Sequence, residues 1–189
     1  NNFLIIGLVG RLIIKRKGQE VFIKAAAILN KKYPDVRFVC IGSCYPGNEF
    51  HLVNLNNLVK NYSLNNIVIF TGEVSDIKAV YKALDVSVMA SGNPEPFGGV
   101  TLESMAYYTP VVGTNIGGTP EQIIDGITGI LIPPNHPEKM ADALEKLILD
   151  PKLRVDMGKE GYKHFKNKFL FEPYYEKIKY YYDLISITS

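Results

Sequence analysis

The chain has 189 residues, a length typical of one domain with a sizeable hydrophobic core. Hydrophobic residues make up 47% of it, charged residues 21%, and the net charge is only +2, so we expect a soluble globular protein, and composition offers no support for nucleic-acid binding. No apolar run is long enough to span a bilayer, and no targeting signal can be read. The two cysteines, Cys40 and Cys44, are too few for a disulfide scaffold, which fits the cytoplasmic localisation that we predict.

Strand-like apolar runs alternate with helical patterns along the first two thirds of the chain. The expected strands cover residues 3–9, 36–41, 67–70, 86–90, 111–113 and 129–132. The expected helices among them cover residues 18–33, 49–62, about 76–84, 98–108 and a short segment that opens at Pro120, and either Ser75 or Asp76 can cap the third of them. This alternation predicts an α/β fold, a doubly wound parallel sheet of about six strands with helices on both faces.

The last part of the chain, about residues 137–186, is predicted to be helical throughout. Helices are expected over residues 137–149, from 150 to about 165, and over 172–185. We interpret these helices as a cover for the sheet, and the tyrosines of the last one as packing residues. They are Tyr174, Tyr175, Tyr180, Tyr181 and Tyr182. Residues 1–189 are thus predicted to form a single domain.

Polar and glycine residues follow several of the predicted strands directly. Arg11, Gly42, Gly72 and Glu95 occupy such positions, as do residues 114–118. Because the carboxyl ends of parallel strands meet at one edge of a sheet, and ligands bind at that edge, we expect these residues to gather around a ligand.

The most informative stretch is residues 91–106, a Gly- and Pro-rich loop that leads into a short helix. Gly98 and Gly99 leave the backbone N–H groups of the helix start open, which favours an anion such as phosphate. The carboxylates of Glu95 and Glu103 flank this start and are better suited to accept hydrogen bonds from hydroxyl groups. A ligand with both phosphate and hydroxyl-rich rings, a nucleotide sugar, satisfies both halves of such a site.

Several motifs occur together in one order along nearly the whole chain. Seven residues separate Glu95 from Glu103, with Pro-Phe-Gly-Gly between them. The others are Val9-Gly10-Arg11-Leu12, Lys17-Gly18, Thr71-Gly72-Glu73-Val74, residues 110–114, Gly117-Gly118 and residues 125–129. This set resembles the signature of retaining glycosyltransferases of family four, the glycosyl transferases group 1. The resemblance implies a Rossmann-like domain, the C-terminal, donor-binding half of a GT-B enzyme, with the N-terminal acceptor domain absent from this chain.

The resemblance also implies roles for individual residues. Arg11 and Lys17 would stabilise the departing diphosphate, with Lys15 and Arg16 left as alternatives to Lys17, and Glu95 would contact hydroxyls of the donor sugar. These are the predicted catalytic residues Arg11, Lys17 and Glu95. Glu103 would accept hydrogen bonds from the ribose. The other predicted donor-binding residues are Gly10, Gly72, Glu73, Val74, Phe97, Gly98 and Gly99.

The implied activity is hexosyltransferase-type transfer from a nucleotide sugar, with retention, to an unknown acceptor, as in polysaccharide biosynthesis. No Asp-x-Asp occurs, so no metal and no cofactor are predicted. The predicted partners are the nucleotide sugar and the protein's own N-terminal domain, and peripheral membrane association of the full-length protein is left open. The alternatives are a non-catalytic nucleotide-sugar-binding module, inactive without that N-terminal domain, and a scaffold whose site has decayed.

The spacing of the glycines argues against two other nucleotide-binding classes. Gly42 and Gly47 have the spacing of a P-loop, but Asn48-Glu49 stands where the Lys-Ser/Thr pair is required. No Gly-x-Gly-x-x-Gly follows the first strand, which argues against a dinucleotide oxidoreductase.

Overall fold

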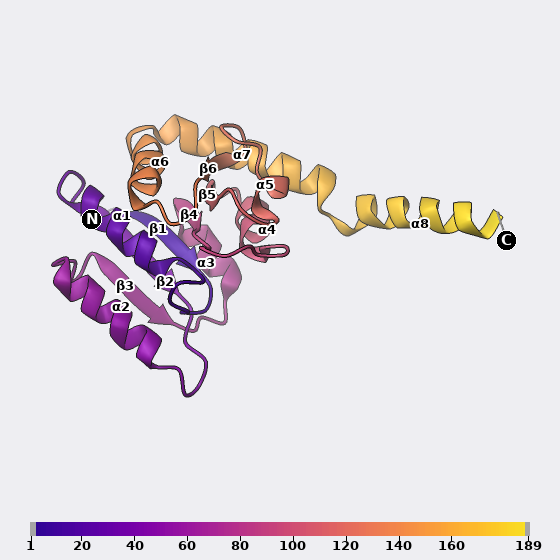
Figure 1. Cartoon of the computed structure of the whole chain (residues 1–189). Coiled ribbons are helices and arrows are strands. Elements are labelled where there is room, and N and C mark those ends of the chain that lie inside the picture. Colours follow the sequence, from indigo (N-terminus) through magenta and orange to yellow (C-terminus); the bar gives the residue numbers. More distant parts are fainter. Residues whose placement is uncertain (1–2, 188–189) are drawn as a thin grey trace.

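The fold is built on one parallel sheet, seen in a computed structural model that describes residues 3–187 (Figure 1). Its strands are β1 (Leu4–Val9), β2 (Val36–Ile41), β3 (Val68–Gly72), β4 (Val86–Met89), β5 (Val111–Thr114) and β6 (Gly129–Ile132). All neighbouring strands are parallel, in the order β3-β2-β1-β4-β5-β6. This order confirms the predicted doubly wound sheet, and it places the reversal of strand order between β1 and β4.

The helices fall close to the predicted ranges. They are α1 (Gln19–Asn30), α2 (Phe50–Asn61), α3 (Ile77–Ala83), α4 (Gly99–Ala106), α5 (Thr119–Gln122), α6 (Pro137–Leu149), α7 (Pro151–Lys168) and α8 (Phe171–Ile187). Asp76, rather than Ser75, caps α3, because its Oδ1 accepts a hydrogen bond from the N–H of Ala79 at 2.9 Å.

Helices cover both faces of the sheet, and the alternation of side chains along β1 shows why both faces must be covered. Ile6 and Leu8 are buried in the large core cluster beneath α1, α2 and α6. Ile5 and Val9 point to the opposite face and pack against a smaller cluster that contains Tyr81 of α3. Because successive side chains of a strand alternate between the faces, an apolar strand such as β1 needs a helical layer on each side.

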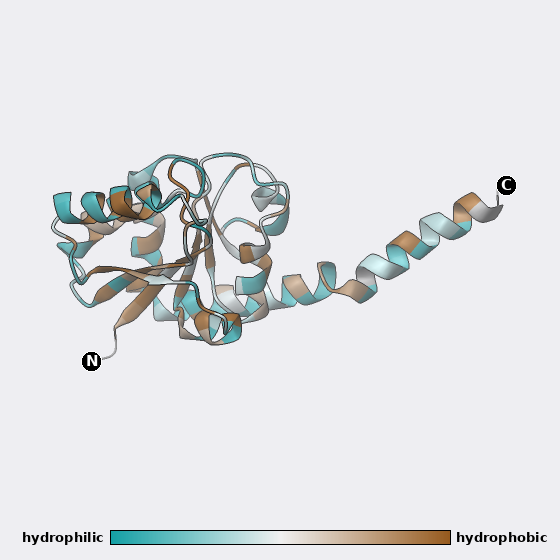
Figure 2. Cartoon of the chain, turned by 90° about the horizontal axis from the view of Figure 1, so that it is seen from below, coloured by the Kyte–Doolittle hydropathy of each residue, from teal (hydrophilic) through white to brown (hydrophobic). Residues whose placement is uncertain are grey.

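The three C-terminal helices do not all cover the sheet, so that interpretation was wrong for α8. Helix α6 packs on α1, and α7 contacts α6, β6 and α4 as it passes along the β6 edge. Helix α8 contacts α7 and otherwise extends away from the body (Figure 1), with polar and apolar residues along its length (Figure 2). Its tyrosines are exposed and do not cover the sheet. An apolar stripe predicts that a helix has a packing face, but it does not say which surface covers that face.

One glycine allows two loops at the carboxyl edge of the sheet to touch. Gly18, which precedes α1, has φ of 75°, and a Cβ added to it would lie 1.9 Å from the carbonyl oxygen of Ala90, the residue that follows β4. A side chain at this position would therefore push the loop after β1 away from the loop after β4.

The packing of α6 on the sheet leads to a stability prediction. Leu144 is fully buried, so Leu144→Ala is expected to lower the free energy of unfolding by about 2–5 kcal/mol through lost burial and a cavity. Leu149, on the same helix, is 64% exposed, and Leu149→Ala is expected to change the free energy of unfolding by less than about 0.5 kcal/mol. Urea denaturation of both variants checks this. Equal effects would contradict the assigned orientation of α6.

Candidate functional site

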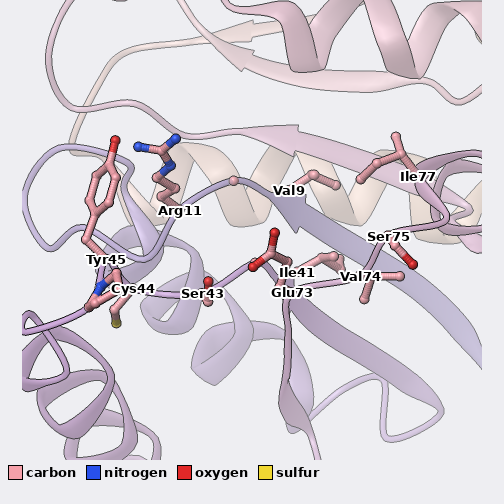
Figure 3. Close-up of a pocket in the computed structure, with 13 residues that line it drawn as sticks. Val9, Arg11, Ile41, Ser43, Cys44, Tyr45, Glu73, Val74, Ser75 and Ile77 are labelled. Atoms are coloured by element: carbon pink, nitrogen blue, oxygen red, sulfur yellow. The ribbon is translucent and has the colours of Figure 1, made fainter.

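A pocket of about 550 Å³ lies where β1, β2 and β3 end (Figure 3). Four predicted donor-site residues line it: Gly10, Arg11, Glu73 and Val74. Gly72 lines an adjoining pocket of about 390 Å³, which shares the loop after β2 with the first. The topology thus brings together residues that lie more than sixty positions apart in the sequence, as predicted from the strand ends.

Arg11 is held in this pocket from two sides. Its guanidinium carbon lies 3.9 Å from the centroid of the Tyr45 ring, a cation–π contact. Its backbone carbonyl accepts a hydrogen bond of 2.8 Å from Nε2 of Gln19, a fully buried side chain at the start of α1. The Arg11 side chain is exposed, so its charge remains accessible from the pocket.

Glu73 supplies a carboxylate to the same pocket. Figure 3 shows this carboxylate directed toward the middle of the pocket, between Arg11 and Val9. Among the described residues, no hydrogen bond or ion pair involves it. The pocket therefore contains a fixed positive group and an unengaged hydrogen-bond acceptor.

Lys17 and Glu95 form an ion pair between the loop after β1 and the loop after β4. Their Nζ and Oε1 atoms are 2.6 Å apart, and the Ser91 hydroxyl also donates to Oε1, at 3.2 Å. The two side chains are only 25% and 11% exposed. Of the three consecutive cations, it is Lys17 that reaches Glu95, while Lys15 and Arg16 are exposed.

Glu103 is oriented by a buried tyrosine. The hydroxyl of Tyr81, on α3, donates to Oε2 of Glu103 at 2.6 Å. Burial, and next the hydrogen bond and charge of Glu103, raise the pKa of Tyr81, so this hydroxyl remains a donor well above neutral pH. The other carboxylate oxygen of Glu103 faces Gly99, one turn earlier on α4.

The start of α4 has the open form predicted from its glycines. Gly98 occupies the N-cap position with φ of 69°, and no side chain caps the helix. Phe97 is 58% exposed. The first backbone N–H groups of α4 are therefore free of a side-chain cap and can meet an anion.

The structure separates some residues that the sequence grouped. Arg11 stacks on Tyr45 beside Glu73, whereas Lys17 pairs with Glu95 near α4, so the two predicted diphosphate-binding cations have different partners.

A further hollow, of about 590 Å³, lies between α1, the end of α2 and the start of α6. It includes Lys24 and Lys31, but it contains none of the motif residues.

Several residues of the site were missed by sequence reasoning. Ser43 and Tyr45 lie in the loop that has P-loop-like glycine spacing, a signal that points to a functional loop even though the P-loop itself was rejected. Tyr81 and Gln19 lie in helices, where the sequence gives them no feature that sets them apart from other helical positions.

The two cysteines differ in their surroundings. Cys44 lines both pockets. Burial raises the pKa of the Cys40 thiol to about 12, so Cys40 is inert at neutral pH.

Residues 3–187 contain neither a cluster of metal-ligating side chains nor a membrane-spanning helix. This part of the chain contains no group of three or more His, Cys, Asp or Glu side chains placed to hold a metal ion. No helix within it is long and apolar enough to cross a membrane.

Sequence relatives of the chain include bacterial glycosyltransferases. It is 39% identical over 167 residues to the D-inositol 3-phosphate glycosyltransferase of Paenarthrobacter aurescens, covering 86% of this chain and 39% of the relative. It is 31% identical over 179 residues to the capsular polysaccharide biosynthesis glycosyltransferase CapM of Staphylococcus aureus, covering 95% of this chain and 46% of CapM. The chain thus spans less than half the length of these curated relatives.

Solved structures of similar proteins share the fold. HepE of Anabaena, crystallised with UDP and glucose, superimposes with a TM-score of 0.88 at 26% identity, over 96% of this chain and 48% of HepE. The C-terminal domain of the glycosyl transferase group 1 family protein LpcC from Francisella tularensis gives 0.82 at 38% identity, over 89% of this chain and 87% of that domain. The sequence model of the family described as glycosyl transferases group 1 matches residues 1–164, and the chain belongs to this family, with the Rossmann-like fold of GT-B C-terminal domains.

Proposed function

We propose that this chain is the nucleotide-sugar-binding domain of a retaining glycosyltransferase. The observation that carries the proposal is the meeting of Lys17 and Glu95 beside the uncapped start of α4. The pair places a cation and a hydroxyl-binding carboxylate next to free backbone N–H groups. The complex of HepE with UDP and glucose supports this assignment by similarity.

The pocket at the ends of β1 to β3 is proposed to hold the nucleobase. Its 550 Å³ lies within the range of small-molecule pockets, and its mixed lining offers apolar and polar contacts to a heterocyclic ring. Glu73 and Val74 would contact the base, and Arg11, which lines the same pocket, would face the diphosphate. The Glu103 carboxylate, oriented by Tyr81, would accept hydrogen bonds from the ribose hydroxyls.

The departing diphosphate is proposed to be stabilised by positive groups of the chain itself. Breaking the bond between sugar and diphosphate builds negative charge on the leaving oxygen. The Lys17 ammonium, the Arg11 guanidinium and the open N–H groups of Gly98 and Gly99 can stabilise that charge. With these groups no metal ion is needed, and we propose a metal-independent site.

The remaining features of the function are proposals drawn from the family-four-like motifs and the relatives. They are retention of anomeric configuration, a role in polysaccharide synthesis as in CapM, and action in the cytoplasm. The chain covers only 39% of the length of the Paenarthrobacter relative. We therefore propose that the acceptor binds to a part of a longer protein that this chain does not cover. Peripheral membrane association of the whole protein would then depend on that other part.

Donor binding is tested by calorimetric titration with UDP, GDP and ADP in the presence of EDTA. One nucleotide is expected to bind, and Glu103→Ala is expected to weaken it about 10–100-fold, because hydrogen bonds to a charged acceptor are lost. Glu160 is an exposed carboxylate on α7, so Glu160→Ala serves as the matched control. This variant should change the affinity for the nucleotide less than twofold, about the error of the comparison. Equal affinities of wild type and Glu103→Ala would overturn the assigned ribose contact.

The division of labour between this chain and the rest of the protein is tested by a transfer assay. Without the part that holds the acceptor, the chain is expected to transfer sugar at least about 100-fold more slowly than the longer protein, because the acceptor is not positioned. Transfer by the chain at the rate of the longer protein would contradict this. No transfer by the longer protein despite nucleotide binding would favour the non-catalytic binding module.

A further inference from the structure

The loop that carries Glu95 and Phe97 rests on a second segment, residues 117–122, which follows β5. The N–H of Gly118 donates to the carbonyl of Glu95 at 2.9 Å. Nε2 of Gln122 donates a hydrogen bond to the carbonyl of Phe97. The carbonyl groups of Glu95 and Phe97 are thus both held by residues 117–122.

The two segments are in direct backbone contact. A Cβ added to Gly117 would lie 2.5 Å from the carbonyl oxygen of Glu95 and 2.7 Å from its nitrogen, and the φ of Gly117 is 62°. A glycine is required there for both reasons. The loop therefore cannot shift toward residues 117–122, and the hydrogen bonds oppose movement away from them.

Gln122 has the features of a residue held for one hydrogen bond. It is only 2% exposed, and among the described residues its Oε1 has no hydrogen-bond partner. A buried amide oxygen without a hydrogen-bond donor lowers stability. The hydrogen bond that holds the Gln122 side chain in place is therefore the one that its NH₂ group donates to the carbonyl of Phe97. That carbonyl can only accept, which fixes which end of the amide faces it.

This hydrogen bond determines the direction of the next N–H group. In a trans peptide the N–H points opposite to the C=O of the same unit. With the carbonyl of Phe97 drawn toward Gln122, the N–H of Gly98 points away from Gln122, and within residues 3–187 no acceptor takes it up.

We propose that Gln122 is a positioning residue for the donor diphosphate. It locks the peptide between Phe97 and Gly98 so that the N–H of Gly98, together with that of Gly99 at the start of α4, faces the anion. This inference rests on the proposed function, and it gives a role to Gln122, for which the sequence predicted none. Gln122 itself does not touch the ligand.

The test compares Gln122→Met, which keeps the length of the side chain but cannot donate, with Thr119→Val as the matched control. Thr119 is 1% exposed, lies on the same side of Gly98, and has a hydroxyl without a partner in the described part of the chain. Both variants remove one buried polar group beside Gly98, but only the first removes the bond to Phe97. Gln122→Leu is the second variant if Gln122→Met does not fold.

Two readouts separate positioning from general damage. The ligands are whichever of UDP, GDP and ADP binds and the monophosphate of the same nucleoside. Gln122→Met is expected to raise the Kd of the diphosphate about 10-fold and the Kd of the monophosphate less than about threefold. This difference is the one expected for one hydrogen bond to a charged group. In the free chain, the ¹⁵N order parameter of Gly98 is expected to fall from about 0.85 toward 0.6. Thr119→Val should leave both near wild type.

An unchanged order parameter at Gly98 in Gln122→Met would overturn the proposal, as would equal losses of diphosphate and monophosphate affinity. Failure of the wild-type chain to bind any nucleotide would instead overturn the proposed function, and with it the role of Gln122 toward a donor. That failure is recognised before any substitution is made, so the two outcomes are distinct.

Discussion

The site depends on the close backbone contact between the loop after β1 and the loop after β4. Gly18 lies against the carbonyl of Ala90 with no room for a side chain, and the N–H of Gly92 donates to the carbonyl of Arg16 at 3.0 Å. β1 and β4 are neighbours because the strand order reverses between them. That reversal opens the crevice in which ligands of such sheets bind, and here the two loops beside it are held in register.

The ion pair of Lys17 with Glu95 follows from this contact. The cation comes from the first half of the fold and the carboxylate from the second, and they meet at 2.6 Å only because the loops that carry them are joined. Removing one partner of a buried ion pair is more damaging than removing both, because a charge is left without compensation. Since a quarter of the Lys17 side chain is still exposed, its ammonium can also meet an arriving anion.

Much of the fold could be predicted from the sequence, because short apolar runs bounded by turn residues predict strands directly. The start of α4 at its two glycines, and the gathering of strand-end residues at one edge, also followed from local pattern and topology. Partners across the fold could not be predicted. Nothing in the sequence near Tyr81 or Gln122 shows that one would meet Glu103 and the other the carbonyl of Phe97, because these bonds join distant segments. The expectation that α8 covers the sheet was wrong for a similar reason, since an amphipathic pattern does not identify its partner surface.

The central claim, that a nucleotide sugar binds across the carboxyl edge at the β1 and β4 loops, is tested most directly by mapping amide shifts during nucleotide titration. The account predicts that the largest ¹H–¹⁵N shifts occur at Arg11 and Val74, which line the pocket, at Lys17, which pairs with Glu95, and at Gly98 and Gly99, which form the start of α4. Shifts confined to the larger hollow around Lys24 and Lys31, between α1 and α6, would contradict it. They would place the nucleotide away from every motif residue of the chain.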